Sequence, residues 1–191
     1  MKRLIPFMLI IMLLLSSCFS TEVEKVEDTP NENLPAPQSM DELYELYGNV
    51  SQGMTKEELD SLYGEPTPSY DDFGDVKFYT YFNEIKSSGV SVIFDRNDAV
   101  ATKILFFNTK TNLIPFSGRY IDEKIPLIKT DMPLQTAISE MGSTPLEISC
   151  QYTNEGPDST KNIFCWYNED GSNFMVHTET GLISSVILYR D

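Results

Sequence analysis

Two stretches of the sequence, residues 50–66 and 128–145, align with each other, and this internal repeat restricts the possible folds more than any other feature. Met54 aligns with Met132 and Gly64 with Gly142, each pair 78 positions apart. Two later pairs of stretches match in the same order, 79–84 with 164–169 and 100–107 with 182–189. Three matches in one order indicate that the chain uses a single structural unit twice.

Each copy has the pattern of a helix followed by strands. In the first copy Thr55 and Glu58 form a capping box, and Gly64 ends the helix. In the second copy Leu134 and Met141 belong to an apolar stripe with helical spacing. We also expect a helix over 40–47 and strands over 77–83, 90–95, 100–107, 146–153, 162–168, 172–178 and 182–190. The expected fold class is α+β, with two tandem helix-plus-antiparallel-sheet units over 39–118 and 119–191 and the helices packed on one sheet face.

The first copy also resembles a known family. Residues 53–66, GMTKEELDSLYGEP, are similar to the opening of the SmpA/OmlA family of small envelope lipoproteins, and the duplication resembles the beta-lactamase inhibitory protein (BLIP-like) fold, a tandem of such units. The second copy departs from the pattern, with Asp131 in place of Gly53 and Pro133 in place of Thr55. The resemblance implies the fold and a general tendency to bind proteins, and no inhibitory or assembly residue is carried over.

The first 17 residues have the pattern of a signal peptide. Lys2 and Arg3 precede the apolar run from Leu4 to Leu15, which at 12 residues is too short to cross a bilayer of about 30 Å as a permanent helix. The run resembles a bacterial lipoprotein signal, which implies cleavage before Cys18 and attachment of lipid to its sulfur. The alternative is an ordinary secretory signal with a chance cysteine. Residues 18–38 then form the lipidated Cys and a disordered acidic tether.

These segments imply a protein held at the extracytoplasmic face of the cell membrane, or at the outer membrane if the organism has one. The whole chain has 29 acidic and 14 basic residues and a net charge of −15. Loss of Lys2 and Arg3 leaves 12 basic residues and a net charge of −17. Such acidity argues against binding to nucleic-acid phosphates and against electrostatic attraction to anionic lipids, so the anchor must hold the protein at the membrane. A protein partner would have a basic or neutral surface.

Two cysteines lie in the second copy, on neighbouring expected strands. A hairpin centred on residues 156–159 pairs Cys150 with Cys165, and outside the cell such a pair is expected to form a disulfide. A loop of this length gives roughly 3 kcal/mol in the chain-entropy model. The alternative is two reduced, buried and unpaired thiols.

Strand alternation then sorts the side chains by face. The hairpin places seven residues on the face expected to meet the helices: Leu146, Ile148, Cys150, Tyr152, Ile163, Cys165 and Tyr167. Phe164 and Trp166 fall on the other face among polar neighbours, and the repeat puts Tyr79 and Tyr81 at the equivalent positions. We expect these four aromatic residues to form a partner-binding surface, because aromatic residues dominate binding hot spots. The alternative is that the four rings stabilise the sheet or are covered by a loop.

The sequence offers little material for catalysis. His177 is the single histidine, and residues 95–98 resemble part of a calcium loop that lacks the required Gly and Glu. We therefore expect no catalytic residue, no metal site, no cofactor and no enzyme. The predicted function is a non-catalytic protein-binding module on a membrane-anchored lipoprotein. The alternatives are a structural or assembly subunit of a cell-envelope complex, or, by analogy with the tandem inhibitor alone, an inhibitor of a secreted enzyme.

Overall fold

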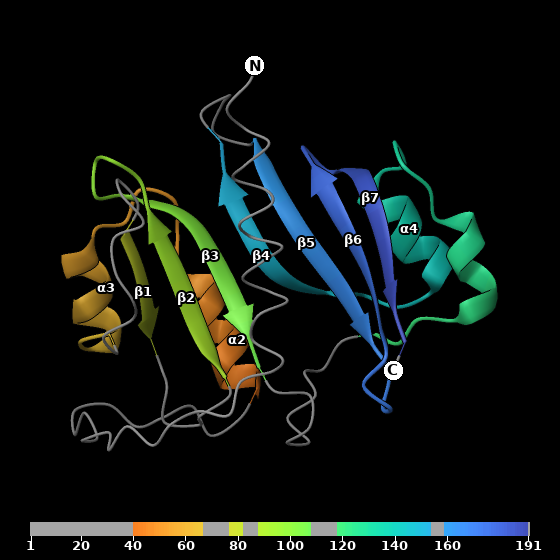
Figure 1. Ribbon diagram of the computed structural model, residues 1–191, viewed down its shortest axis with the longest axis horizontal. Coiled ribbons are helices and arrows are strands. Elements are labelled where there is room, and N and C mark those ends of the chain that lie inside the picture. Colours follow the sequence, from red (N-terminus) through yellow and green to blue (C-terminus); the bar gives the residue numbers. More distant parts are fainter. Residues whose placement is uncertain (1–39, 67–76, 82–87, 108–117, 154–158, 191) are drawn as a thin grey trace. The chain divides into compact units, whose positions relative to one another are not determined.

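The computed structural model describes residues 40–66, 77–81, 88–107, 118–153 and 159–190, all of which belong to one unit over residues 31–191. The described elements are shown in Figure 1. In chain order they are α2 (Met40–Asn49), α3 (Lys56–Tyr63), β1 (Lys77–Tyr81), β2 (Gly89–Phe94), β3 (Val100–Phe106), the 3-10 helix η2 (Asp122–Leu127), α4 (Leu134–Met141), β4 (Leu146–Tyr152), β5 (Thr160–Tyr167), β6 (Asn173–Glu179) and β7 (Leu182–Tyr189).

The described strands form one antiparallel sheet, which makes the fold α+β. Its seven strands follow the chain order from β1 at one edge to β7 at the other. Pairing of β3 with β4 joins the two halves of the chain, with Lys103 opposite Cys150. The two halves therefore share a continuous sheet, and their division into tandem units at residue 118 stays a prediction.

The helix boundaries follow the local sequence signals. Thr55 accepts a hydrogen bond from the N–H of Glu58, whose carboxylate accepts one from the N–H of Thr55, so the predicted capping box is confirmed. Helix α4 begins after Pro133, and Gly142 ends it in the left-handed region at φ 75°. The 3-10 helix η2 was not expected, because its six residues carry no helical periodicity.

The helices pack on one face of the sheet, which we call the helix face. Lys103 of β3 lies on it, because its Nζ donates to the carbonyl oxygens of Tyr47 and Val50 at the end of α2. Residues directly opposite each other in neighbouring strands lie on the same face, so Cys150, opposite Lys103, and Asn162, opposite Cys150, also lie on the helix face. Side chains alternate along β5, so Trp166, four residues after Asn162, lies on the helix face as well. Figure 1 accordingly shows α2 behind β2 and β3, and α4 next to β7.

The apolar side chains of the helix face belong to two hydrophobic clusters, and the first cluster also includes side chains of the other side of the sheet. One contains Leu43 and Leu59 of the helices with Val90, Val92 and Tyr81 of the sheet, and the other joins Ala137 of α4 to β5, β6 and β7. We call the other side of the sheet the opposite face. Its buried side chains include Ile93, Thr102, Leu146, Ile148, Ile163, Cys165, Tyr167 and His177. None of the described helices packs on the opposite face.

Candidate interaction surface

The four aromatic residues predicted to bind a partner lie on the helix face, and the prediction that they form a recognition surface is wrong. Tyr81 is 1% exposed and Trp166 is fully buried, while Tyr79 and Phe164 are half-buried against the same clusters. The Trp166 Nε1 donates to the carbonyl oxygen of Ser143 at 2.9 Å. Val90, Val92, Val176 and Ile183 lie on the same face in other strands, so the aromatic rings contribute to the core beneath the helices.

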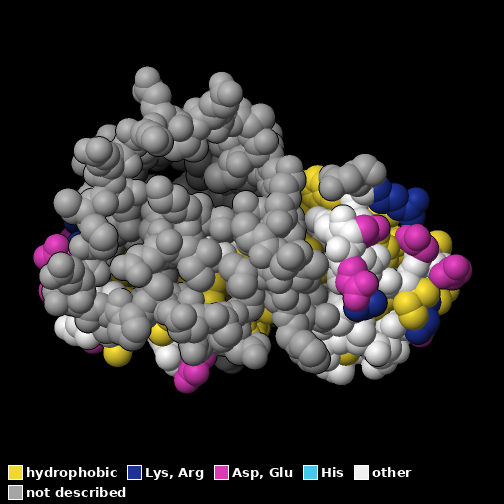
Figure 2. All heavy atoms as spheres, turned by 90° about the horizontal axis from the view of Figure 1, so that it is seen from below, with side chains coloured by type: hydrophobic (Ala, Val, Ile, Leu, Met, Phe, Trp, Pro, Cys, Tyr) yellow, Lys and Arg dark blue, Asp and Glu magenta, His cyan; other side chains and the backbone are white. Residues whose placement is uncertain are grey.

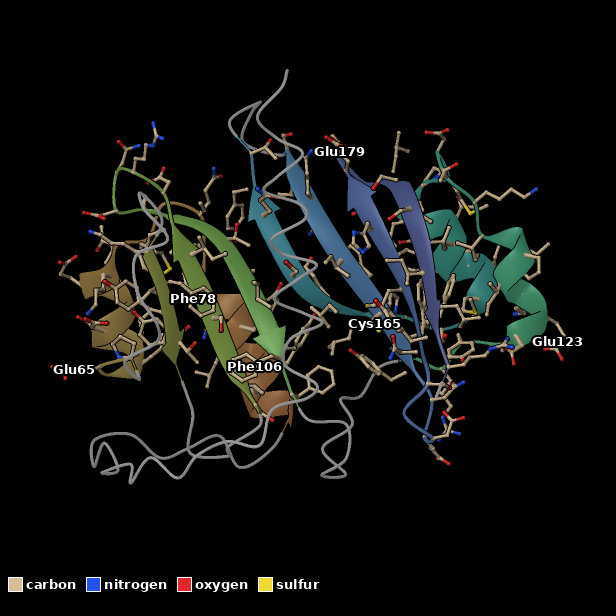
Figure 3. All side chains as sticks on the ribbon, viewed as in Figure 1. Glu65, Phe78, Phe106, Glu123, Cys165 and Glu179 are labelled. Carbon is tan, nitrogen blue, oxygen red and sulfur yellow. The ribbon has the colours of Figure 1, made fainter. Side chains whose placement is uncertain are left out.

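The predicted disulfide is absent: Cys150 and Cys165 are both buried free thiols. Cys150 pairs across the sheet with Asn162, and Cys165 pairs with Leu146. A β-bulge in β4 changes the alternation between these two pairs, so that Cys150 lies on the helix face and Cys165 on the opposite face. Cys165 is labelled in Figure 3. The sheet therefore separates the two sulfur atoms. Burial raises the pKa of Cys150 to about 11 and that of Cys165 to about 12, which leaves both thiols unreactive.

The bulge also divides the seven residues that were expected to share a face. Leu146, Ile148, Ile163, Cys165 and Tyr167 lie on the opposite face, whereas Cys150 and Tyr152 lie on the helix face. The hydroxyl of Tyr152 donates to the carbonyl oxygen of Val50 at 3.3 Å. The expectation that all seven meet the helices is therefore wrong.

The predicted lipidation site, Cys18, lies outside the described residues, as do the signal segment and the tether. In the part of the chain that is described, no helix is long and apolar enough to cross a membrane.

Metal and acid–base chemistry has little support among the described residues. They contain no group of three or more His, Cys, Asp or Glu side chains that could hold a metal ion. The carboxylate of Asp95 accepts hydrogen bonds from the backbone N–H groups of Asn97 and Ala99, so this turn is stabilised without a cation. His177 lies buried in β6, and burial lowers its pKa.

A polar cluster joins α2 to the centre of the sheet. Besides its two bonds to α2, the Lys103 ammonium lies 4.4 Å from the ring centroid of Tyr47. The Tyr47 hydroxyl donates to Glu147, whose other carboxylate oxygen accepts from Asn162 at 2.7 Å. Burial lowers the pKa of Lys103, and the negative charge of Glu147 opposes that shift. Lys103 and Glu147 thus hold α2 on the sheet and Asn162 holds Glu147, so the cluster has a structural role.

Exposed apolar side chains gather on β7, the last strand of the sheet. Eight large hydrophobic side chains are exposed among the described residues, and four belong to β7: Leu182, Val186, Leu188 and Tyr189. Two more, Ile121 and Leu127, belong to the η2 region, which the Arg190–Asp122 ion pair links to the end of β7. Figure 2 shows hydrophobic side chains among acidic and basic ones on the right of the view, where α4 and η2 lie. Val186 and Leu188 lie on the helix face, and Leu182 and Tyr189 lie on the opposite face, so these exposed side chains flank the β7 strand on both sides of the sheet.

The outer edge of β7 also presents backbone groups that have no partner among the described residues. The N–H of Ile183 donates to Met132 and its carbonyl accepts from Asp131, so both groups of Ile183 point away from β6. On β6, Thr178 lies opposite Ile183, Val176 lies opposite Val186, and Phe174 lies opposite Leu188. These three β6 residues are each two positions apart, so their backbone groups point the same way. Alternation in an antiparallel ladder therefore points the backbone groups of Val186 and Leu188 outward too. We call residues 185–189 with these groups the free β7 edge.

The described residues together form an α+β fold with one antiparallel sheet, a face covered by helices, and an edge at β7 that no other described strand pairs with. No family model and no curated protein matches the chain. Among solved structures it is similar to a protein from Streptococcus mutans described as a "putative beta-lactamase inhibitor protein". The two share 13% sequence identity with a TM-score of 0.47, over 75% of this chain and 86% of the other. Similarity at this level assigns no function to the chain.

Proposed function

We propose that this protein is a non-catalytic protein-binding module, anchored by lipid on Cys18 to the extracytoplasmic face of a membrane, and that the free β7 edge is its binding surface. The observation that carries the proposal is the gathering of apolar side chains on β7 that are each at least 37% exposed. The partner surface that fits a chain of net charge −15 is basic or neutral. The resemblance to SmpA/OmlA lipoproteins stays a prediction from the first repeat.

The binding surface is tested by affinity capture with the full chain, solubilised from membranes in detergent. Replacing Val186 and Leu188 together by Asp should abolish capture of the specific partner, because two charges would then have to be buried in the contact. The matched control is Leu62→Asp, since Leu62 is 52% exposed on α3 and lies far along the sheet from β7. Equal capture by the β7 variant and the Leu62 variant would refute the proposed surface.

The anchor is tested separately. Cys18→Ala should release the protein from washed membranes and remove incorporation of labelled fatty acid, because acyl chains supply about 0.8 kcal/mol of membrane affinity per buried CH₂. A Cys165→Ala variant serves as the control, because a buried thiol has no access to the lipid-transfer enzyme. Membrane retention of the Cys18 variant would exclude a lipid anchor at this residue.

A further inference from the structure

The last strand of each half of the sheet has the same local contacts. In the first half the N–H of Val100 donates to Met54, and its carbonyl accepts from Gly53. Ile183 in the second half makes the same two bonds, with Met132 and Asp131. An isolated β-bridge lies next to these bonds in both halves. It pairs Thr55, just before α3, with Ala99, and Pro133, just before α4, with Leu182.

The two strands also contain the same irregularity. The register of β2 with β3 skips one residue, Ala101, just after Val100, and the register of β6 with β7 skips Ser184 just after Ile183. Counting from this bulge, Lys103 of β3 corresponds to Val186 of β7, and Leu105 corresponds to Leu188. The outward backbone groups of β3 are therefore those of Lys103, as they are those of Val186 on β7.

The equivalence ends at the outer edge. On β3 that edge is filled by an antiparallel strand of the same chain, with Cys150 of β4 directly opposite Lys103. On β7 the corresponding position opposite Val186 has no strand among the described residues, and the Val186 side chain is 37% exposed. The fold thus has two copies of a strand-accepting edge, of which the described part of the chain occupies one.

We infer that the free β7 edge binds an extended segment of a partner protein as an eighth, antiparallel strand, in the way that β3 binds β4. The inference rests on the proposed function and names its mode of binding. Main-chain hydrogen bonds to Val186 and Leu188 would supply the pairing, and apolar side chains of the segment would cover the exposed ones of β7.

Charge decides between a foreign segment and a second copy of this chain. Residues 182–189 carry no charge, so nothing on the strand itself would attract a second β7. Two copies would instead bring together two chains of net charge −15, which repel each other. The occupant is therefore a segment of another protein, apolar at alternate positions and flanked by neutral or basic residues.

Hydrogen exchange on the full chain in detergent micelles tests the pairing without any substitution. The probe is a synthetic peptide of the β4 sequence 146–152, with serine in place of cysteine and two lysines at each end. Its addition should slow exchange of the Val186 and Leu188 amides, while the Ile187 amide, already bonded to β6, keeps its rate. Unchanged Val186 and Leu188 amides at saturating peptide would overturn the inference.

A pair of variants separates backbone pairing from side-chain contact. Val186→Pro removes one outward N–H, a change that edge strands tolerate, and Val186→Ala shortens the side chain but keeps the N–H. The peptide should bind the Pro variant at least about tenfold more weakly, and the Ala variant at most about threefold more weakly. Equal losses would refute strand pairing while leaving β7 as a binding surface. The proposed function would instead be refuted by the capture experiment, if the β7 double variant and the Leu62→Asp variant captured the partner equally well.

Two further outcomes contradict the choice of occupant. A peptide flanked by glutamates that binds as tightly as the lysine-flanked one would remove the charge argument. A dimer seen by light scattering, and dissolved by Val186→Pro, would identify a second copy as the occupant in place of a foreign segment.

Discussion

Replacement of Trp166 measures how far the helix face depends on its aromatic residues. The indole is fully buried, lies 5.6 Å from the Phe174 ring between centroids, and donates to the Ser143 carbonyl. Removing a buried Trp side chain costs about 3–5 kcal/mol of the free energy of unfolding. Trp166→Phe keeps most of the ring and loses the hydrogen bond, which costs about 1–2 kcal/mol. In a domain of this size the Ala variant should melt roughly 6–20 °C lower.

The measurement is urea unfolding followed by far-UV circular dichroism, because Trp166 is the only tryptophan and its fluorescence is lost with it. Tyr189→Ala is the control, since that ring is 53% exposed at the end of β7, and its cost should stay within about 0.5 kcal/mol. If Trp166→Ala cost less than about 1 kcal/mol, the ring would not be part of the core, and the assignment of α4 to this face would fail.

Two other measurements test the buried titratable groups. A Cys18→Ala chain that is unfolded without reductant should give two titratable thiols, those of Cys150 and Cys165. The same chain in its native state should give almost none, because both thiols are buried. If the unfolded chain gave no thiol, the two cysteines would be joined by a disulfide. Burial lowers the pKa of His177, so below about pH 6.5 the unfolded chain takes up a proton that the folded chain does not, and the free energy of unfolding falls. His177→Phe should reduce that fall between pH 7.5 and pH 5 in urea titrations, and an unchanged pH dependence would show that His177 does not contribute.

The elements themselves could be predicted because their signals are local. The capping box at Thr55 and the left-handed Gly142 fix the start of one helix and the end of another within single turns of chain. The seven strands also begin and end within two residues of the predicted bounds. Only η2 lacked a sequence signal of this kind.

Register could not be predicted, because it depends on a bulge that the sequence does not mark. The prediction placed Cys150 opposite Cys165, but Cys150 lies opposite Asn162 and Cys165 lies opposite Leu146. Between these two pairs Ile148 and Ser149 together occupy the place of one residue opposite β5. Every residue of β4 beyond the bulge then moves to the other face from the one that simple alternation assigns. The predicted register is therefore shifted by three residues at Cys150, and because that number is odd, the prediction put both thiols on the same side of the sheet.

The choice of covered face failed for a different reason, which lies in the composition of β5. Alternation identifies a buried face only when the two faces differ in polarity, and β5 has Ile163, Cys165 and Tyr167 on one face and Phe164 and Trp166 on the other. The helices alone decide between two apolar faces, and no residue of β5 encodes where α4 will lie. The same limit explains why the free β7 edge was not anticipated. No described strand pairs with the outer side of Val186 and Leu188, and strand alternation carries no information about which strands will be neighbours.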